Sequence, residues 1–184
     1  MARLKEYNGH YCESEYEYAF IGFLEAEGWK YSSGNNIHRV TKRDVLIVDD
    51  FKKFIADTNP DLTEDEVIQI YDNVRLVGAE SDFATLHKVY GWMVNGVQFT
   101  PQDGLPRMIP LIEFENWDKN IFRVVNQFTV EYTNNGQKEN RRPDVLLFVN
   151  GMPLCVIELK NPADANATIY DAWEQINIRY WRDI

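Results

Sequence analysis

Apolar residues recur at helical spacing over the first part of the chain. Residues 13–27 have this pattern and are followed by Gly28, a residue that readily ends a helix in the left-handed conformation. Residues 41–56 form a second apolar-rich segment, which Asn59-Pro60-Asp61 interrupts. We therefore predict a helical N-terminal portion.

A capping box marks the start of a further helix. Thr63-Glu64-Asp65-Glu66 places a threonine at the N-cap and, three residues later, a glutamate that can bond back to it. Another helix is predicted from 81 to about 92, before Asn95-Gly96. The buried stripe of the capped helix is expected to consist of Val67, Ile70, Tyr71 and Val74.

After Pro110 the apolar residues no longer recur at helical spacing. Residues 122–132 are β-branched and aromatic and predict one strand, followed by a polar loop from 133 to 140. Residues 145–149 and 154–159 are unbroken apolar runs, joined by a tight turn in which Asn150-Gly151 supplies positive φ angles. Because both runs are apolar throughout, we expect two central strands that are covered on each face.

The last segment, 168–183, returns to helical spacing, and no internal repeat or linker interrupts the chain. We therefore expect a single α/β domain over residues 1–184. The apolar stripe of the last helix is expected to contain Ile169, Ala172, Trp173, Ile176 and Tyr180.

Composition excludes several classes of protein. With 45% apolar residues in 184, the chain can bury a core, and no apolar run approaches the roughly 20 residues of a membrane span. Residues 1–7 lack the apolar stretch of a signal peptide, so we expect a cytoplasmic location and no membrane partner. Two cysteines, Cys12 and Cys155, are too few for a cysteine zinc site and are expected to be packing residues.

The net charge of −10 argues against unaided binding of nucleic acid. Residues 1–120 hold 12 Lys/Arg against 21 Asp/Glu, whereas residues 121–184 hold 7 against 8. The acidic surface is thus expected on residues 1–120, and a partner would have to supply most of the affinity for DNA.

Two carboxylates and a lysine are predicted to meet at one edge of the sheet. Glu158 and Lys160 end the second apolar run and share a face, since side chains alternate along a strand. Asp144 opens the first run, and the tight turn makes the two strands antiparallel neighbours. The alternative is that Glu158 and Lys160 form an ordinary surface ion pair and that Asp144 merely starts a strand.

This combination suits metal-assisted hydrolysis of a phosphodiester. Carboxylate oxygens bind Mg²⁺ (or Mn²⁺), which activates a bound water and neutralises charge on the phosphoryl oxygens. Lys160 could orient or deprotonate the water, or stabilise the transition state, and the sequence leaves these roles open.

Longer sequence phrases resemble one known family. Arg141-Arg142-Pro143-Asp144, residues 148–154 and Ile157-Glu158-Leu159-Lys160-Asn161-Pro162 resemble the N-terminal nuclease domain of the restriction (motor) subunit of type I restriction–modification enzymes. That domain belongs to the PD-(D/E)xK nuclease superfamily. Residues 124–130, 17–21 and Gly28-Trp29 resemble it as well, so the likeness spans nearly the whole chain.

The resemblance implies a restriction-endonuclease-like core, in which a β-hairpin on a mixed sheet flanked by helices carries the active site. Asp144 and Glu158 would be metal ligands and Lys160 the catalytic lysine. The family's leading helix often adds a glutamate. Glu13 and Glu17 share a stripe here, and Glu17 is the preferred candidate, although either could simply begin an exposed helix.

The family also has a Q-x-x-x-Y motif after the lysine, from which this chain departs. Gln175 is followed by Arg179 at the fourth position and by Tyr180 at the fifth. On an α-helix Gln175 and Arg179 share a face, so these two are candidates for contact with DNA phosphate, or else solvated surface residues. The role of the tyrosine is thereby placed in doubt.

The family implies double-stranded DNA as substrate, and methylation and specificity subunits as partners. No G-x-x-x-x-G-K-[ST] motif occurs, so ATP is expected to bind only in a motor region that this chain lacks. We interpret the chain as the N-terminal fragment of a longer restriction subunit. Two alternatives stay open, namely a related nuclease of another defence or repair system and a catalytically silent docking domain.

Overall fold

A computed structural model describes residues 13–77, 82–102, 104–134, 136–160 and 168–180 of the chain. The chain divides into two units. The first combines the described parts of Met1–Val45, Phe122–Phe148 and Pro153–Ile184, and the second those of Leu46–Ile121 and Val149–Met152. A single nuclease domain over the whole chain stays a prediction.

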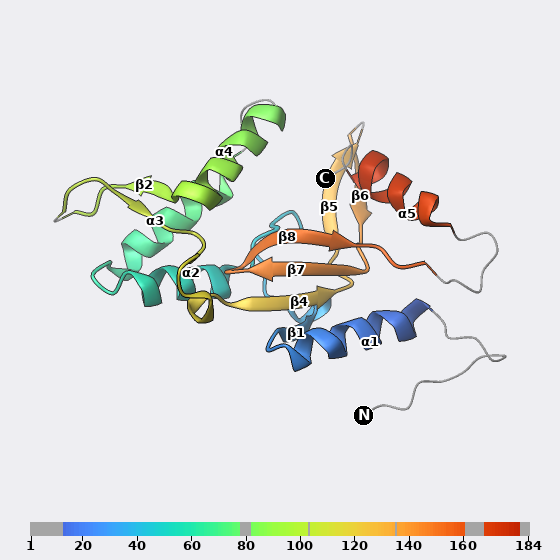
Figure 1. Cartoon of the computed structure of the whole chain (residues 1–184). Helices are drawn as coiled ribbons and strands as arrows, with labels where there is room; N and C mark the ends of the chain where they lie inside the picture. The colour runs from blue at the N-terminus through green and yellow to red at the C-terminus, as the bar shows by residue number, and fades with distance from the viewer. Residues whose placement is uncertain (1–12, 78–81, 103, 135, 161–167, 181–184) are drawn as a thin grey trace. The chain divides into compact units, whose positions relative to one another are not determined.

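A mixed four-stranded sheet organises the first unit, in the order β1-β4-β7-β8. Strand β1 (Lys30–Ser33) lies parallel to β4 (Phe122–Asn126). Strand β7 (Val145–Val149) runs opposite to both of its neighbours, β4 and β8 (Met152–Ile157), as the arrows in Figure 1 show. The prediction of an α/β fold with a mixed sheet is confirmed at this level.

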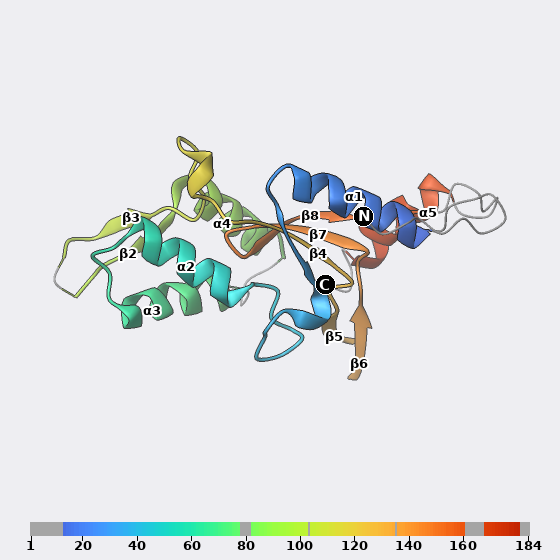
Figure 2. The ribbon, with the colours of Figure 1, turned by 90° about the horizontal axis from the view of Figure 1, so that it is seen from below.

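Helix α1 (Glu13–Ala26) lies along one face of this sheet (Figure 2). Its buried residues Ile21 and Leu24 pack in one cluster with Val124 and Val145 of the sheet. The helix ends as predicted, since Gly28 adopts a φ of 92° that other residues rarely take. A short 3₁₀ turn (Gly34–Asn36) follows β1.

The turn between β7 and β8 is confirmed, although it is two residues long and β8 begins at Met152. Asn150 and Gly151 have φ angles of 51° and 77°, as an Asn-Gly hairpin turn requires. A Cβ atom at Gly151 would also collide with the carbonyl oxygen of Ile47. The turn is therefore fixed both by its local geometry and by the chain packed against it.

The predicted single strand over 122–132 is wrong, and so is the polar loop over 133–140. Strand β4 ends at Asn126, and Gln127 takes a φ of 54° that turns the chain out of the sheet. Strands β5 (Val130–Asn134) and β6 (Gln137–Arg141) then form a separate antiparallel hairpin. Its polar residues face solvent on a two-stranded ribbon, so no apolar alternation marks it in the sequence.

The expectation that both apolar strands are covered on each face holds only for β7. Strand β8 is the edge of the sheet, with Leu154 41% and Val156 36% exposed. Cys155 is exposed as well, contrary to the packing role expected for it, and Cys12 lies outside the described residues. An unbroken apolar run therefore did not distinguish an edge strand from a central one.

The C-terminal helix is also less regular than predicted. Helix α5 (Ile169–Glu174) passes into a π-helix (Gln175–Tyr180), and residues 181–184 lie outside the described part. Ile169 is 90% and Trp173 50% exposed, whereas Tyr180 is buried. The predicted apolar stripe is thus not a buried face in this chain, apart from the tyrosine.

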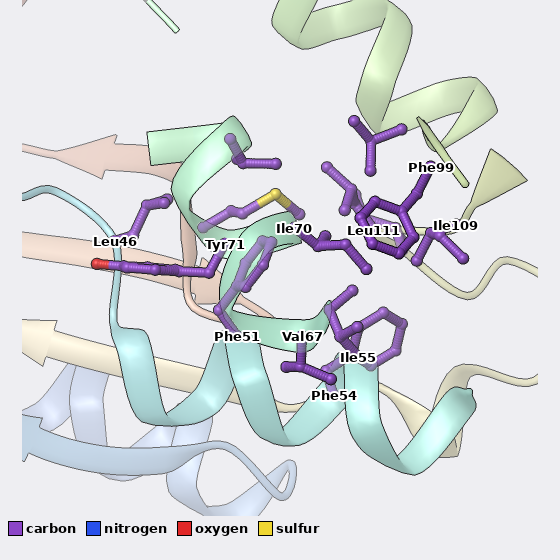
Figure 3. Close-up of a cluster of buried hydrophobic side chains, with 14 of the residues drawn as sticks. Leu46, Phe51, Phe54, Ile55, Val67, Ile70, Tyr71, Phe99, Ile109 and Leu111 are labelled. Atoms are coloured by element: carbon purple, nitrogen blue, oxygen red, sulfur yellow. The ribbon is translucent and has the colours of Figure 1, made fainter. Parts of the chain in front are cut away.

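The second unit is mainly helical and has its own core (Figure 3). It contains α2 (Val48–Thr58), α3 (Glu64–Arg75), α4 (Asp82–Asn95), a 3₁₀ turn (Trp117–Lys119) and a small ribbon of β2 (Val97–Phe99) and β3 (Arg107–Ile109). The four predicted core positions of α3 are buried there against Phe51, Phe54 and Ile55 of α2.

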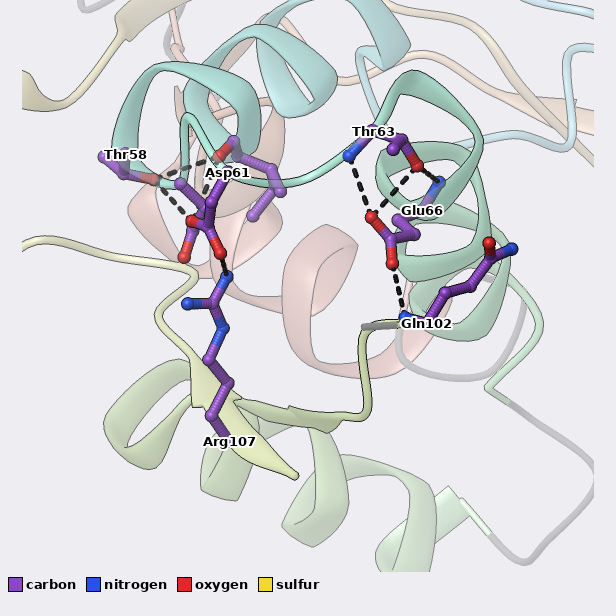
Figure 4. Close-up of polar contacts among 8 residues, drawn as sticks. Thr58, Asp61, Thr63, Glu66, Gln102 and Arg107 are labelled. Atoms are coloured by element: carbon purple, nitrogen blue, oxygen red, sulfur yellow. Dashed lines mark hydrogen bonds and ion pairs between the residues drawn. The ribbon is translucent and has the colours of Figure 1, made fainter. Parts of the chain in front are cut away.

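The capping box of α3 is confirmed (Figure 4). The Thr63 amide donates to Glu66 Oε2 at 2.8 Å, and the Glu66 amide donates to Thr63 Oγ1 at 3.3 Å. The other Glu66 oxygen accepts from the amide of Gln102 at 2.8 Å, so the cap also anchors the loop after β2.

Every helix among the described residues is too short or too polar to pass through a lipid bilayer.

Candidate active site

Asp144 and Glu158 lie at the same end of the sheet, where β7 begins and β8 ends (Figure 1). Asp144 Oδ2 accepts a hydrogen bond of 2.8 Å from the Leu159 amide, which ties the start of one strand to the residue after Glu158. The antiparallel hairpin thus brings the two acids together, as the tight turn predicted. Asp144 therefore does more than begin a strand, because its carboxylate contacts the segment that carries Glu158.

Burial is the main reason why the pKa of the Glu158 carboxyl is raised to about 7. A hydrogen bond from Tyr180 and the charge of Lys160 lower this pKa, whereas the Asp144 carboxyl raises it through its charge and hydrogen bonding. Glu158 is therefore not an ordinary surface carboxylate. Two half-buried acids share one site, and a cation placed between them would relieve their repulsion.

Lys160 joins the site through Gln175. Its ammonium donates to Gln175 Oε1 at 3.2 Å, and Gln175 Nε2 donates to Glu158 Oε2 at 2.7 Å. The glutamine thus holds the lysine and the glutamate at fixed positions relative to each other. The sequence makes Gln175 a candidate for contact with DNA phosphate, but in the structure its amide bonds to Lys160, Glu158 and Tyr180.

Tyr180 completes the cluster, although the α-helical spacing had placed its role in doubt. Its hydroxyl donates to Glu158 Oε1 at 2.6 Å and accepts from Gln175 Nε2 at 2.8 Å. Burial and the neighbouring glutamate raise the pKa of Tyr180, so the hydroxyl keeps its proton. The sequence leaves the role of Tyr180 open because an α-helix continued to its end would place this residue away from Gln175.

The π-helix explains the difference in register. Its backbone bonds join residues five apart, so Gln175 and Tyr180 at i and i+5 come to one side. The same change leaves Arg179 exposed on the surface. Compared with the Q-x-x-x-Y motif, this chain has one more residue between the glutamine and the tyrosine. The wider turn of the π-helix accommodates this residue, and both side chains still reach Glu158.

Glu17 reaches the same end of the sheet from α1. It is only 5% exposed, and its two oxygens accept from Asn126 Nδ2 at 2.6 Å and from Gln127 Nε2 at 3.1 Å. The backbone amide of Gln127 donates in turn to the carbonyl oxygen of Asp144 at 3.0 Å. Glu17 is thus linked to Asp144 through Gln127, whereas Glu13 is half-buried at the start of the helix.

Asn126 and Gln127 are further members that the sequence analysis missed. The Asn126 carboxamide accepts from the Tyr31 hydroxyl at 3.1 Å and is 3% exposed. Two polar residues directly after the apolar Val124-Val125 were the available signal, since a buried amide at a strand end needs partners. The β-branched and aromatic pattern instead predicts one strand over 122–132 that contains both residues.

The donor set is small. Within the described ranges, no three His, Cys, Asp or Glu side chains come together as a metal cluster. Asp144 and Glu158 form a pair, and Mg²⁺ is commonly held by one or two carboxylates while waters and substrate phosphates fill its other positions. The pair therefore fits Mg²⁺ and does not fit a metal that needs a full cage of protein ligands.

Known proteins similar to this chain carry one consistent description. A subunit named Type I restriction enzyme HindI endonuclease subunit, from Haemophilus influenzae, is 31% identical over 177 residues, which are 89% of this chain. A protein of Methanocaldococcus jannaschii, provisionally named type I restriction enzyme MjaIXP endonuclease subunit, is 36% identical over 167 residues, or 85% of the chain. In each case the match covers 16% of the relative's length.

The sequence family described as the type I restriction enzyme R protein N terminus matches residues 11–183. This match includes both strands of the β7–β8 hairpin and the segment with Gln175 and Tyr180. The chain therefore belongs to the family of the N-terminal region of the type I restriction enzyme R protein.

Proposed function

We propose that this chain is a Mg²⁺-dependent endonuclease domain that hydrolyses phosphodiester bonds of double-stranded DNA by the PD-(D/E)xK mechanism. The observation that carries the proposal is the shared site of Asp144 and Glu158, with Lys160 joined to Glu158 through Gln175. A docking domain without catalysis would have no use for two acids whose burial and repulsion cost stability.

The roles follow from the positions of the side chains. Asp144 and Glu158 would hold Mg²⁺, which when bound supplies an activated water and neutralises charge on the phosphate. Gln175 keeps the Lys160 ammonium beside Glu158, where it can orient the water or stabilise negative charge in the transition state. Glu17 acts through Gln127 as a positioning residue for Asp144.

The wider assembly is proposed from the family. The chain spans 16% of the length of the two curated relatives described above, which are named as endonuclease subunits. We propose that the motor region of a longer subunit uses ATP to deliver DNA, and that methylation and specificity subunits direct the complex to its site. Arg179, exposed on the π-helix, stays a candidate for contact with DNA phosphate.

Metal binding tests the proposed site directly. Glu158→Ala removes one of two carboxylates and is expected to weaken Mg²⁺ or Mn²⁺ binding by at least about tenfold, as measured by calorimetry on the purified chain. Glu17→Gln is the matched control, because both Glu17 oxygens already accept from amides and a smaller loss is expected. Equal losses in the two variants would make Glu17 a ligand, and unchanged binding in Glu158→Ala would refute the site.

Tyr180→Phe tests the contribution of the π-helix. The variant keeps the ring but removes the hydroxyl that donates to Glu158, so cleavage by the assembled enzyme is expected to fall about tenfold. Cleavage rates at saturating Mg²⁺ measure the effect. Tyr170→Phe, on an exposed side chain of α5, is the control and should cut at the wild-type rate. Equal rates for both variants would show that the Tyr180 hydroxyl has no part in the reaction.

A further inference from the structure

Positive charge gathers in two segments of an otherwise acidic chain. Residues 37–45 and 130–142 together carry six Lys/Arg against three Asp/Glu, although the whole chain has a net charge of −10. The second unit, by contrast, has six Lys/Arg against fourteen Asp/Glu over residues 46–121 and 149–152. The two basic segments belong to the first unit, as does the candidate active site.

Hydrogen bonds hold these segments side by side. The Glu131 amide of β5 donates to the carbonyl oxygen of Lys42 at 3.0 Å. The Arg43 guanidinium donates to Thr133 Oγ1 at 2.6 Å, on the same strand. The loop before α2 is therefore attached along the β5–β6 hairpin by backbone and side-chain contacts.

The register of the hairpin extends this basic surface. Thr133 lies opposite Lys138, so Lys138 shares the face on which Arg43 lies. Three acids lie in these segments. Glu131 lies 4.0 Å from the exposed Lys42 ammonium and neutralises it only weakly, Asp44 accepts from the backbone amide and hydroxyl of Thr41, and Glu139 accepts from Tyr132 on the other face of the hairpin. Arg141 belongs to the other face, where its guanidinium lies 5.3 Å from the ring centre of Tyr132.

The hairpin leads straight into the candidate active site. After β6, the exposed Arg142 and the buried Pro143 connect to Asp144 at the start of β7. Figures 1 and 2 both show the hairpin leaving the sheet at the end where β7 begins. A strand of DNA whose phosphate lies at Asp144 would place neighbouring phosphates within reach of this hairpin.

We propose that Lys42, Arg43, Lys138 and Arg142 bind the phosphate backbone of DNA beside the scissile bond. The proposal rests on the proposed nuclease function and adds where the substrate is held. Exposed lysine and arginine side chains contact phosphates without regard to base sequence, so the surface positions DNA and does not select a target. An acidic protein would match the charge as well, but the connection to Asp144 favours the substrate itself.

Salt-dependent binding tests this surface without any cleavage. The probe is a fluorescein-labelled duplex of about 20 base pairs, followed by anisotropy with the purified chain and no divalent cation. Lys138→Ala combined with Arg142→Ala should weaken binding about tenfold at low salt and reduce the slope of log K against log salt by about 2. The control, Lys53→Ala with Lys119→Ala, removes the same charge from exposed positions in the second unit.

The control pair is expected to leave the slope unchanged. Equal effects of the two pairs, an unchanged slope for the hairpin pair, or no salt-dependent binding by the wild-type chain would each overturn the proposal. If this surface binds an acidic protein and not DNA, the slope for the hairpin pair will be unchanged. Because the binding measurement needs no catalysis, its outcome does not depend on the proposed nuclease function. That function would fail instead if Glu158→Ala still cut DNA.

Discussion

Asp144→Asn is expected to lower DNA cleavage by the assembled restriction enzyme by at least about 10³-fold, because the metal would lose a charged ligand. The asparagine side chain still carries an oxygen that can accept from the Leu159 amide, so the hairpin should keep its geometry. Consumption of ATP should be unchanged, since the ATP site is proposed to lie in the motor region of the longer subunit and not in this chain. The measurements are the rate of double-strand cleavage and the rate of ATP hydrolysis on the same DNA.

Measuring both cleavage and stability separates the loss of a metal ligand from a general destabilisation of the fold. Asp144→Ala should lose as much cleavage, yet destabilise the chain by only about 1 kcal/mol through the lost hydrogen bond. Asp49→Ala, an exposed acid in the first turn of α2, is the control and should cut normally. Cleavage by Asp144→Asn within tenfold of the wild type would refute the assignment of Asp144 as a metal ligand.

Asn150→Ala is expected to destabilise the chain by about 4 kcal/mol, among the largest effects of any single substitution here. The Asn150 side chain is fully buried. Its Oδ1 accepts from the Ile121 amide at 2.7 Å, and its Nδ2 donates to the Leu111 carbonyl at 2.9 Å and to Asn120 Oδ1 at 2.8 Å. Alanine would leave these groups without their partner in a site closed to water.

Chemical denaturation of the purified chain measures this effect, and a second variant separates its causes. Asn150→Gly relieves the positive φ of 51° but also lacks the side chain. If the buried bonds dominate, glycine should cost nearly as much as alanine, within about 1 kcal/mol. A nearly neutral Asn150→Gly would show that backbone conformation alone selects asparagine. Asn177→Ala, at an exposed position, should leave stability unchanged.

The candidate site was predictable where it depends on neighbouring strands joined by a short turn. Asn150-Gly151 fixes an antiparallel hairpin, and this alone brings Asp144 beside Glu158. Side-chain alternation along one strand does not relate Glu158 to Lys160, because β8 ends at Ile157 and Gln175 joins the two side chains. The contacts that Gln127 and Tyr180 add could not be predicted in this way, because each depends on a local departure from regular backbone geometry.

Local pattern determined α1, α3 with its capping box, and the β7–β8 hairpin, because caps, turns and helical periodicity act over a few neighbouring residues. Tertiary structure decided the rest. The break after Asn126, the polar β5–β6 hairpin and the exposed edge at β8 depend on which segments pack against each other. The π-helix belongs with them, since the wider turn keeps Gln175 and Tyr180 bonded to a glutamate on a distant strand.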